Sequence, residues 1–389
     1  MKVLAITGIR SEYDILYPVL KALHVNKNYE LELVVSGAHL SQWHGKTYKQ
    51  IENDGFKIVD RIDSLVSTDR EVQRPLAVSN LLAGLARIVE RQKPDILLVV
   101  GDREESIATA IVGNYMNVLV AHIGGGDPVW GNSDDPIRMA TSKLSHLHFA
   151  TTKQYCQNLE ALGEDAWRIH MCGTPGLDNI RMEEELPLET VASFIGTDLQ
   201  DYVVLINHPL SSEAKDILEE TNILLGGLEK FCMRNNYKVV CIEPNSDPGS
   251  FEIVEAYNRH VSNNFKMVNT LPRSIFVNLM RNSRALIGNS SMGILEAPMY
   301  KLPVVNVGNR QRGRLNAGNV KFVPFERKAI LSALEEAALD EGYRKEVASL
   351  VNPYGDGRAA EIILDVFSNI DAKSQKWLVK QQLVKKKVL

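Results

Sequence analysis

Short apolar runs recur along the first half of the chain and predict β-strands. Runs of this kind, rich in valine, leucine and isoleucine, are typical of strands buried on both faces of a parallel sheet. The predicted strands are Val3–Ile6, Leu31–Val35, Ile96–Val100, Val118–Ile123 and His148–Ala150. Between them, Asp14–Leu23 and Leu81–Arg91 place apolar residues three or four positions apart, which predicts amphipathic helices.

The second half of the chain repeats the same alternation. Its predicted strands are Val203–Ile206, Val239–Ile242, Ala285–Gly288 and Val304–Val307. Its predicted helices are Ala214–Phe231, Phe251–His260, Ile275–Met280 and Ala329–Leu339. Buried strands that alternate with helices form parallel sheets covered on both faces. We therefore expect an α/β fold with two Rossmann-like, doubly wound domains.

The chain length also favours two domains, because 389 residues exceed the size at which one hydrophobic core usually stops growing. The segment between Gly173 and Leu199 opens with Gly-Thr-Pro-Gly and continues with acidic residues, so we place the junction there. We expect an N-terminal domain at 1–180 and a C-terminal domain at 181–357, with a ligand cleft between them. By fold analogy, the terminal helix and basic tail at 358–389 would cross back to the N-terminal domain.

Charge excludes some classes of partner. The net charge is -4, whereas nucleic-acid-binding proteins carry a basic excess, so we expect no nucleic-acid partner. The stretch 373–387 is the exception, because it carries several lysines and no acidic residue. It predicts a solvated or crossing terminal helix, with a membrane or RNA contact as the weaker alternative.

Cysteine spacing and the start of the sequence bear on location. The four cysteines have no CxxC spacing and no histidines clustered beside them, which predicts buried thiols in a reducing compartment and no metal site. Met1-Lys2 leads directly into the apolar run Val3–Ile6, which is too short for a signal peptide or a membrane span. We expect a cytoplasmic protein without a metal, a cofactor or a membrane partner.

Polar loops follow most of the predicted strands, and ligands of open parallel sheets bind at the carboxyl ends of the strands. These loops are Thr7–Asp14, Gly101–Glu104, His122–Asp127, Asn207–Pro209, Pro244–Asp247, Asn289–Ser291 and Gly308–Gln311. Arg10 takes the place of the second glycine of a dinucleotide-binding loop, and Leu40 the place of the first glycine of a P-loop. A G-x-S-x-G nucleophile elbow is missing too, so the remaining loops favour an anionic sugar nucleotide.

The segment Leu286–Glu296 predicts a strand, a polar turn at Ser290-Ser291 and the start of a helix. Two hydroxyls, the backbone N–H groups of the first helical turn and the helix dipole would all face one anion, such as a diphosphate. Glu296 is placed to accept hydrogen bonds from two ribose hydroxyls. The alternative is a serine N-cap on an ordinary helix.

Other candidate residues also have two interpretations. Arg10 is either a diphosphate ligand or the partner of Glu12 or Asp14 in a surface ion pair. Asp102 is either an acid/base group or the N-cap of a helix that starts at Arg103.

Two further polar positions stand next to prolines. His208 precedes Pro209, which restricts its backbone and favours contact with a ligand over a place in the core. The run Asp134-Asp135-Pro136 predicts a helix start with Asp135 at the N-cap and Pro136 as the first helical residue. One of the two carboxylates would then be structural and the other would face the ligand.

Together these motifs resemble the UDP-N-acetylglucosamine 2-epimerase family, and especially its hydrolysing branch in sialic and related nonulosonic acid synthesis. The resemblance runs from about Lys2 to Gly357, with the motifs in the order of the family. The matching motifs are Gly101-Asp102-Arg103, Gly124–Asp127, Asp134–Leu144, His208-Pro209, Ile287–Ser291 and Gly308–Arg314. The resemblance implies a fold of the two-domain glycosyltransferase-B type.

The resemblance also implies a reaction without metal or cofactor. UDP leaves C1 as a base removes the proton at C2, and water then adds to the glycal to give N-acetylmannosamine. Its implied acid/base residues are Asp102, Asp135 and His208. Its implied ligands of the UDP-sugar are Arg10, Asp14, Arg103, Asn245, Ser290, Ser291, Glu296 and Arg310, and a homodimer is the implied assembly.

This chain departs from the family at Gly124, where relatives carry an acidic residue or a histidine. Asp127 or Glu104 would then supply the missing carboxylate, or the glycine makes room for a different sugar. Met139-Ala140 also replaces His-Ala. The expected substrate is UDP-N-acetylglucosamine; the alternatives are a UDP- or GDP-linked diacetamido trideoxy hexose, a retaining glycosyltransferase reaction, and a noncatalytic nucleotide-sugar-binding protein.

Overall fold

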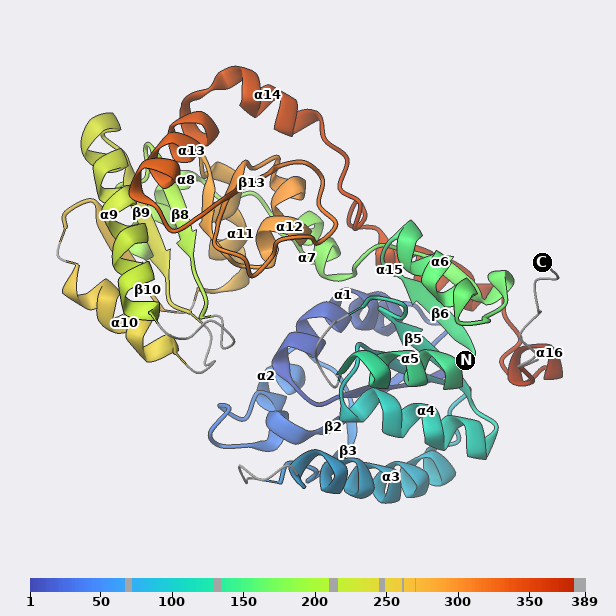
Figure 1. The fold of residues 1–389 in the computed structure, drawn as a ribbon. Helices are drawn as coiled ribbons and strands as arrows, with labels where there is room; N and C mark the ends of the chain where they lie inside the picture. The colour runs from blue at the N-terminus through green and yellow to red at the C-terminus, as the bar shows by residue number, and fades with distance from the viewer. Residues whose placement is uncertain are drawn as a thin grey trace. The chain divides into compact units, whose positions relative to one another are not determined.

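A computed structural model describes residues 1–66, 72–128, 134–209, 216–244, 249–260, 262–269 and 271–380 (Figure 1). The chain divides into two compact units. The N-terminal unit comprises Met1–Arg181 and the residues from Tyr354 onward, and the C-terminal unit comprises Met182–Pro353. Each unit contains a parallel sheet with helices on both faces, which confirms the predicted α/β class with two Rossmann-like sheets.

The described part of the N-terminal unit forms a seven-stranded sheet in the order β3-β2-β1-β4-β5-β6-β7. All of its pairings are parallel; Val3, for example, pairs with Leu31 on one side and Ile96 on the other. The strands are β1 (Lys2–Thr7), β2 (Glu30–Ser36), β3 (Ile58–Ile62), β4 (Ile96–Val100), β5 (Leu119–Ile123), β6 (Leu147–Ala150) and β7 (Ile169–Met171). The carboxyl ends of these strands share one edge of the sheet.

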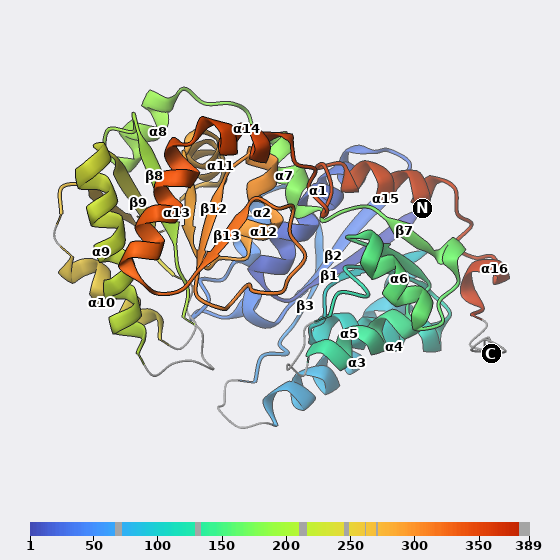
Figure 2. The same ribbon diagram turned by 45° about the horizontal axis from the view of Figure 1, so that its top comes forward.

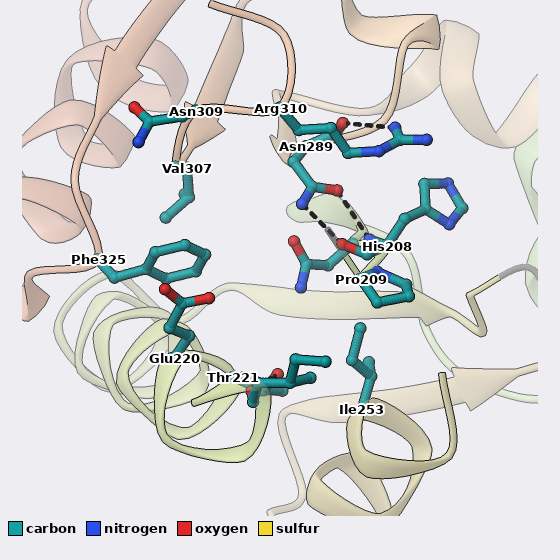
Figure 3. A pocket seen from close by; sticks show the side chains of 13 residues that line it. His208, Pro209, Glu220, Thr221, Ile253, Asn289, Val307, Asn309, Arg310 and Phe325 are labelled. Atoms are coloured by element: carbon teal, nitrogen blue, oxygen red, sulfur yellow. Dashed lines mark hydrogen bonds between the residues drawn. The ribbon is translucent and has the colours of Figure 1, made fainter. Parts of the chain in front are cut away.

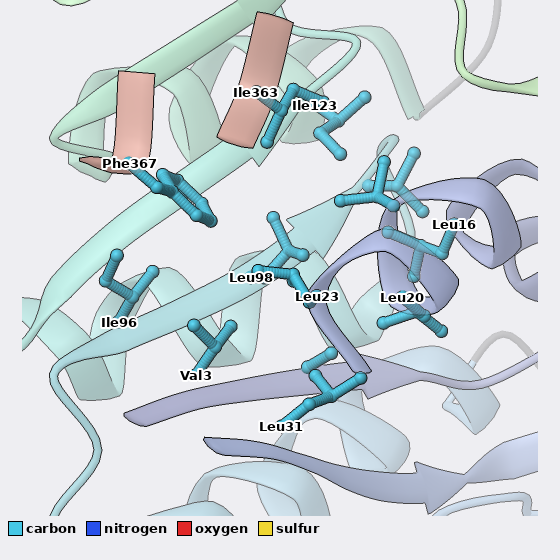
Figure 4. Close-up of a cluster of buried hydrophobic side chains, with 14 of the residues drawn as sticks. Val3, Leu16, Leu20, Leu23, Leu31, Ile96, Leu98, Ile123, Ile363 and Phe367 are labelled. Atoms are coloured by element: carbon cyan, nitrogen blue, oxygen red, sulfur yellow. The ribbon is translucent and has the colours of Figure 1, made fainter. Parts of the chain in front are cut away.

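Side chains alternate between the two faces of this sheet. Val3 and Leu98 pack against α1 and α15 on one face, in the cluster that Figure 4 shows. Leu4 and Leu97 pack against α3 and α4 on the other face. The helices of the unit are α1 (Arg10–Val25), α2 (Tyr48–Asn53), α3 (Gln73–Gln92), α4 (Glu104–Met116), α5 (Asp134–Leu144), α6 (Lys153–Ala161), α7 (Gly176–Met182), α15 (Ala359–Ser368) and α16 (Gln375–Leu378), with short 3-10 turns η1 (Gly37–Leu40) and η2 (Ala166–Arg168).

The described part of the C-terminal unit forms a six-stranded parallel sheet in the order β10-β9-β8-β11-β12-β13 (Figure 2). Its strands are β8 (Tyr202–Ile206), β9 (Lys238–Ile242), β10 (Phe265–Val268), β11 (Leu286–Gly288), β12 (Val304–Val307) and β13 (Val320–Val323). Helices α9 (Ile217–Asn235), α10 (Ser250–Arg259) and α13 (Arg327–Leu339) cover one face. On the other face lie α8 (Leu188–Ile195), α11 (Arg273–Asn282), α12 (Met292–Leu295) and η4 (Ala297–Tyr300), while α14 (Glu341–Ser349) follows α13.

Within the predicted terminal segment 358–389, helix α15 packs in the core of the N-terminal unit. A wholly solvated lysine-rich tail, one of the two interpretations from the sequence, is not what the structure has. Lys380 is 8% exposed and pairs with Glu164 at 2.6 Å. The buried guanidinium of Arg168 donates hydrogen bonds to the carbonyls of Trp377 and Val379, both at 2.8 Å. The chain end up to Lys380 is therefore packed and hydrogen-bonded within the N-terminal unit.

Candidate active site

Asp102 follows β4 at the carboxyl edge of the N-terminal sheet, and its carboxylate is bound by Arg138 of α5. Arg138 Nε donates to Asp102 Oδ2 at 3.1 Å, and a second guanidinium N–H bonds the same oxygen. Helix α4 begins at Glu104 with Arg103 at its N-cap. The interpretation of Asp102 as the N-cap of a helix starting at Arg103 is therefore wrong.

Asp127, in the loop after β5, is bound by the same guanidinium. Arg138 Nη1 lies 3.0 Å from Asp127 Oδ2, and the Arg138 side chain is 12% exposed. One largely buried cation thus holds two carboxylates from neighbouring strand ends, which can accept and donate protons at one place. Glu104, the other proposed source of a carboxylate, pairs instead with Arg74.

Glycines shape the loop that carries Asp127. Gly126 has a φ of 76°, and a Cβ there would lie 2.5 Å from the carbonyl oxygen of Tyr155. A larger residue would therefore force this turn open. Gly124 also has a positive φ, of 80°, and a Cβ there would lie 4.0 Å from the Gly101 backbone nitrogen, which is an ordinary contact. A side chain at this position would therefore fit at its Cβ, yet it would require left-handed backbone.

His122, at the end of β5, connects the loop after β4 to helix α5. Its ring is buried, with Nε2 2.7 Å from the Gly101 carbonyl oxygen and Nδ1 3.3 Å from Ser142 Oγ of α5. Burial lowers the pKa of His122 to about 3, so the ring is neutral at physiological pH. His122 therefore positions the Asp102 loop against α5 rather than carrying charge.

The start of α5 differs from its prediction. The helix begins at Asp134, so Asp135 lies within the first turn and its predicted N-cap position is wrong. Asp134 pairs with Arg74 at 2.6 Å. Arg103, Glu104 and Asp134 line a pocket of about 240 Å³ in this unit.

Arg10 is the first residue of α1, after β1. Its Nε lies 3.6 Å from Asp14 Oδ2, and the two side chains are 53% and 37% exposed. The alternative of an ion pair with Asp14 is thus present, whereas Glu12 turns inward and is buried. Exposed pairs of this kind are weak, so Arg10 remains available to an anion.

In the C-terminal unit, Asn289 ties the ends of two strands together (Figure 3). This buried residue follows β11 and bonds the backbone of His208, which follows β8. The His208 N–H donates to Asn289 Oδ1 at 2.7 Å, and Asn289 Nδ2 donates to the His208 carbonyl at 2.8 Å. Arg310 Nη1 and Gln311 Nε2 both donate to the Asn289 carbonyl at 3.1 Å. His208 and Arg310 line a small pocket of about 20 Å³, room for about one water.

The serine turn is present, and the helix after it is short. Ser291 is the N-cap residue without a side-chain capping bond, and Ser290 Oγ accepts a long hydrogen bond, 3.4 Å, from Met292 N. A serine therefore stands at the N-cap, as the alternative interpretation held, but its hydroxyl makes no capping hydrogen bond. Helix α12 covers only Met292–Leu295, because Pro298 lacks an N–H and disfavours helical backbone before it. A single turn has little dipole, so an anion here would depend on hydroxyl and backbone N–H groups.

The remaining predicted ligands are placed as follows. Glu296 caps the end of α12 and is half-buried. Asn245 lies outside the described residues. Two residues were quoted in motifs without a role: Arg138, which binds two carboxylates, and Asn289, which organises the His208 loop. The strand-end place of Asn289 was the signal that could have found it.

Among the described residues, no cluster of histidine, cysteine, aspartate and glutamate side chains is suited to a metal ion. None of the described helices is both long and apolar enough to cross a membrane.

Two doubly wound parallel sheets, each with polar loops at its carboxyl edge, define the two-domain glycosyltransferase-B type of fold. The family model described as UDP-N-acetylglucosamine 2-epimerase matches residues 21–368. The chain belongs to the UDP-N-acetylglucosamine 2-epimerase family.

Two relatives and one solved structure illustrate the similarity. UDP-N,N'-diacetylbacillosamine 2-epimerase (hydrolyzing) of Legionella pneumophila is 33% identical over 376 residues, which cover 96% of this chain and 97% of the relative. UDP-N-acetylglucosamine 2-epimerase of Neisseria meningitidis is 30% identical, over 86% of this chain and 87% of the relative. The crystal structure of UDP-GlcNAc 2-epimerase from Neisseria meningitidis bound to UDP-GlcNAc has a TM-score of 0.78 at 22% identity, covering 95% of this chain and 100% of that chain. The Legionella relative confirms the resemblance to the hydrolysing branch.

Proposed function

We propose that this protein is a hydrolysing 2-epimerase that converts UDP-N-acetylglucosamine and water to N-acetylmannosamine and UDP. The observation that carries the proposal is the pair of carboxylates, Asp102 and Asp127, held on Arg138 at the carboxyl edge of the N-terminal sheet. Epimerisation at C2 must remove a proton from one face of the sugar and return a proton to the other. Two carboxylates at one place suit that task.

In the first step, one carboxylate accepts the C2 proton while the C1–O bond breaks and its electron pair leaves with UDP. The product is a 1,2-unsaturated glycal. In the second step, water adds its oxygen to C1 and gives up one proton to a carboxylate, while a carboxylic acid returns a proton to the other face of C2. Asp127 supplies the acid/base group for which position 124 has no side chain. Asp135 and His208 remain proposed acid/base residues.

The leaving diphosphate gains negative charge as the C1–O bond breaks, so hydrogen-bond donors must face it. We assign this role to Arg10 and to the hydroxyls of Ser290 and Ser291. The other proposed substrate ligands are Asp14, Arg103, Asn245, Glu296 at the ribose and Arg310 at the nucleotide.

Proton NMR of the protein with UDP-N-acetylglucosamine in deuterated water tests the proposal. Release of N-acetylmannosamine with deuterium at C2 is the expected result, because the returning proton comes from solvent. Release of N-acetylglucosamine without deuterium, or an unchanged substrate, would contradict it. Transfer that needs an added sugar acceptor would indicate a glycosyltransferase instead.

A second candidate substrate is a UDP-linked diacetamido trideoxy hexose. The Legionella relative, a UDP-N,N'-diacetylbacillosamine 2-epimerase (hydrolyzing) that is 33% identical over nearly the whole chain, favours this substrate. The ratio of kcat/KM for the two UDP-sugars decides between them. With either sugar, the product would serve sialic or related nonulosonic acid synthesis.

The proposal includes a homodimer in the cytoplasm. The four cysteines are free, which suits a reducing compartment. Sedimentation equilibrium tests the dimer, and fractionation of cells tests the location.

A further inference from the structure

Two buried glutamates lie on either side of Gly8, in the loop between β1 and α1. Glu12 and Glu105 are 7% and 5% exposed. The Gly8 N–H donates to Glu12 Oε2 at 3.0 Å, while a Cβ at position 8 would lie 2.1 Å from Glu105 Oε1. Both carboxyl groups therefore contact the same glycine, and a larger residue at position 8 would have to displace the Glu105 carboxyl group.

These glutamates come from helices on opposite faces of the sheet. Glu12 lies in the first turn of α1 and Glu105 in the first turn of α4, and the strands that precede these helices, β1 and β4, are neighbours. At such a point the two connections diverge, which opens a crevice at the carboxyl edge. The proposed chemistry does not use either glutamate.

The hydrogen bonds of the pair are incomplete. Ser36 Oγ donates to Glu105 Oε1 at 2.8 Å. Glu12 Oε1, however, is buried and has no hydrogen-bond partner among the described residues. A buried, ionised carboxylate with an unsatisfied oxygen beside a second carboxylate is costly, and one bound proton removes most of that cost.

We propose that Glu12 and Glu105 hold one proton between them at neutral pH, and that the neutral pair positions the Gly8–Arg10 loop so that Arg10 can bind the diphosphate. The positioning part rests on the proposed function, in which Arg10 binds UDP. Glu12 is then a positioning residue: it holds the Gly8 N–H in the manner of a capping box and sets the start of α1.

Some groups around the pair raise the pKa values of the two glutamates and others lower them. Burial, and then the charge of Glu105, raise the pKa of Glu12 to about 8, with a smaller contribution from Asp102. The Gly8 N–H and Arg103 oppose this rise. Burial also raises the pKa of Glu105, with Glu104 adding to it and Ser36 and Arg103 opposing it. His39 of η1, whose N–H bonds the Gly8 carbonyl, is neutral because burial lowers its pKa to about 4.

The first experiment measures thermal unfolding from about pH 5 to about pH 8 in the wild type and in Glu12→Gln. The folded pKa of Glu12, about 8, lies above its ordinary value of 4.5, so the folded protein keeps a proton that the unfolded chain releases. Stability from this group is fully present below about pH 4.5 and is lost as the pH rises through about 8. Glutamine mimics the protonated carboxyl and cannot ionise. We expect the fall in Tm over this range to be about half as large in Glu12→Gln; an equal fall would overturn the shared proton.

The second experiment measures UDP binding by calorimetry at about pH 7 and about pH 9. Above about pH 8 both carboxyls ionise and repel each other across Gly8. We expect the wild type to lose about tenfold in UDP affinity between these pH values, and Glu12→Gln to lose less than about twofold. Glu12→Ala removes the acceptor of the Gly8 N–H and should weaken UDP binding about tenfold at both pH values.

Controls separate the possible outcomes. Glu255→Gln removes an exposed carboxylate in the C-terminal unit and should reproduce the wild type in both experiments. Lys380, whose pKa burial lowers to about 8, titrates alike in all variants, so it cancels from the comparison. UDP affinity that is insensitive to Glu12→Ala would overturn the positioning role. A wild type that binds no UDP at any pH would instead overturn the proposed function, and with it the positioning role, while the unfolding data still decide the shared proton.

Discussion

The two units hold their candidate residues by different kinds of bond. In the N-terminal unit, Arg138 binds Asp102 and Asp127 through ion pairs. In the C-terminal unit, the neutral side chain of Asn289 binds the backbone of His208. The ion pairs hold two carboxylates on one cation, whereas the amide bonds fix the shape of a loop. We therefore expect proton transfer mainly in the N-terminal unit and shaping of the ligand site in the C-terminal unit.

Asp102→Asn gives the largest expected effect and tests the N-terminal half of this comparison. The amide keeps the size of the side chain but cannot accept a proton at neutral pH. We expect kcat to fall by about 10³, within the range for loss of a general acid or base, while UDP affinity stays within about twofold. Steady-state kinetics and calorimetry measure the two quantities. Asp356→Asn, at an exposed carboxylate, serves as the control; a loss of less than about tenfold would remove Asp102 from proton transfer.

His208→Ala tests whether proton transfer extends into the C-terminal unit. The Asn289 bonds go to the backbone of His208, so alanine leaves them intact. We expect kcat to fall by about 10², with UDP affinity nearly unchanged, because only the imidazole is lost. If kcat is retained and UDP affinity falls, His208 contacts the ligand, and proton transfer is confined to the N-terminal unit.

Asn289→Ala tests the C-terminal half of the comparison. It leaves the N–H and carbonyl of His208 without their partners, at about 1 to 3 kcal/mol for each group that stays buried. We expect about thirtyfold weaker UDP binding, a lower Tm and a smaller effect on kcat. Asn289→Asp is the matched variant, because it keeps the acceptor for the His208 N–H and loses the donor. Equal losses in kcat and in UDP affinity would contradict a purely shaping role.

Ser290→Ala removes one hydroxyl from the proposed diphosphate site. A hydrogen bond to a charged group contributes about 1.5 kcal/mol at the low end of its usual range, so we expect UDP affinity to fall about tenfold. Calorimetry with UDP measures the change, and uridine, which has no diphosphate, is the control ligand. Unchanged UDP affinity would exclude Ser290 from the site.

Gly124→Ala gives the smallest expected effect. The new Cβ makes only an ordinary contact, 4.0 Å from the Gly101 backbone nitrogen, but the φ of 80° costs a residue other than glycine about 1 kcal/mol. We expect a Tm lower by a few degrees and kcat within about threefold of the wild type. A severe loss of kcat with an unchanged Tm would show that position 124 contacts the sugar.

The sequence predicted the central strands well because they are buried on both faces and read as unbroken apolar runs. Edge strand β3 was missed, since Asp60 and Arg61 interrupt its pattern, and so was the short, half-exposed β7. Strands β10 and β13, at the edges of the second sheet, were missed because each is short, only half-buried and interrupted by a lysine.

Prediction of the candidate site had a similar limit. Strand ends identified Asp102, His208 and Ser290 as polar positions, because the topology of a parallel sheet determines where its loops lie. The pairing of Arg138 with Asp102 and Asp127 depends on how α5 packs, and sequence spacing does not determine that packing. The sequence predicted a helix start after the serine turn but not where that helix ends, and the structure ends it before Pro298.

The return of the chain end to the N-terminal unit affects how the protein is made. The C-terminal unit is one continuous stretch, so it can complete its core before the ribosome reaches the last residues. The N-terminal unit must wait for α15, whose Ile363 and Phe367 fill the core beside α1. We expect a chain that stops after Pro353 to expose this apolar face, and therefore to be recognised by chaperones and proteases while its C-terminal unit is already folded.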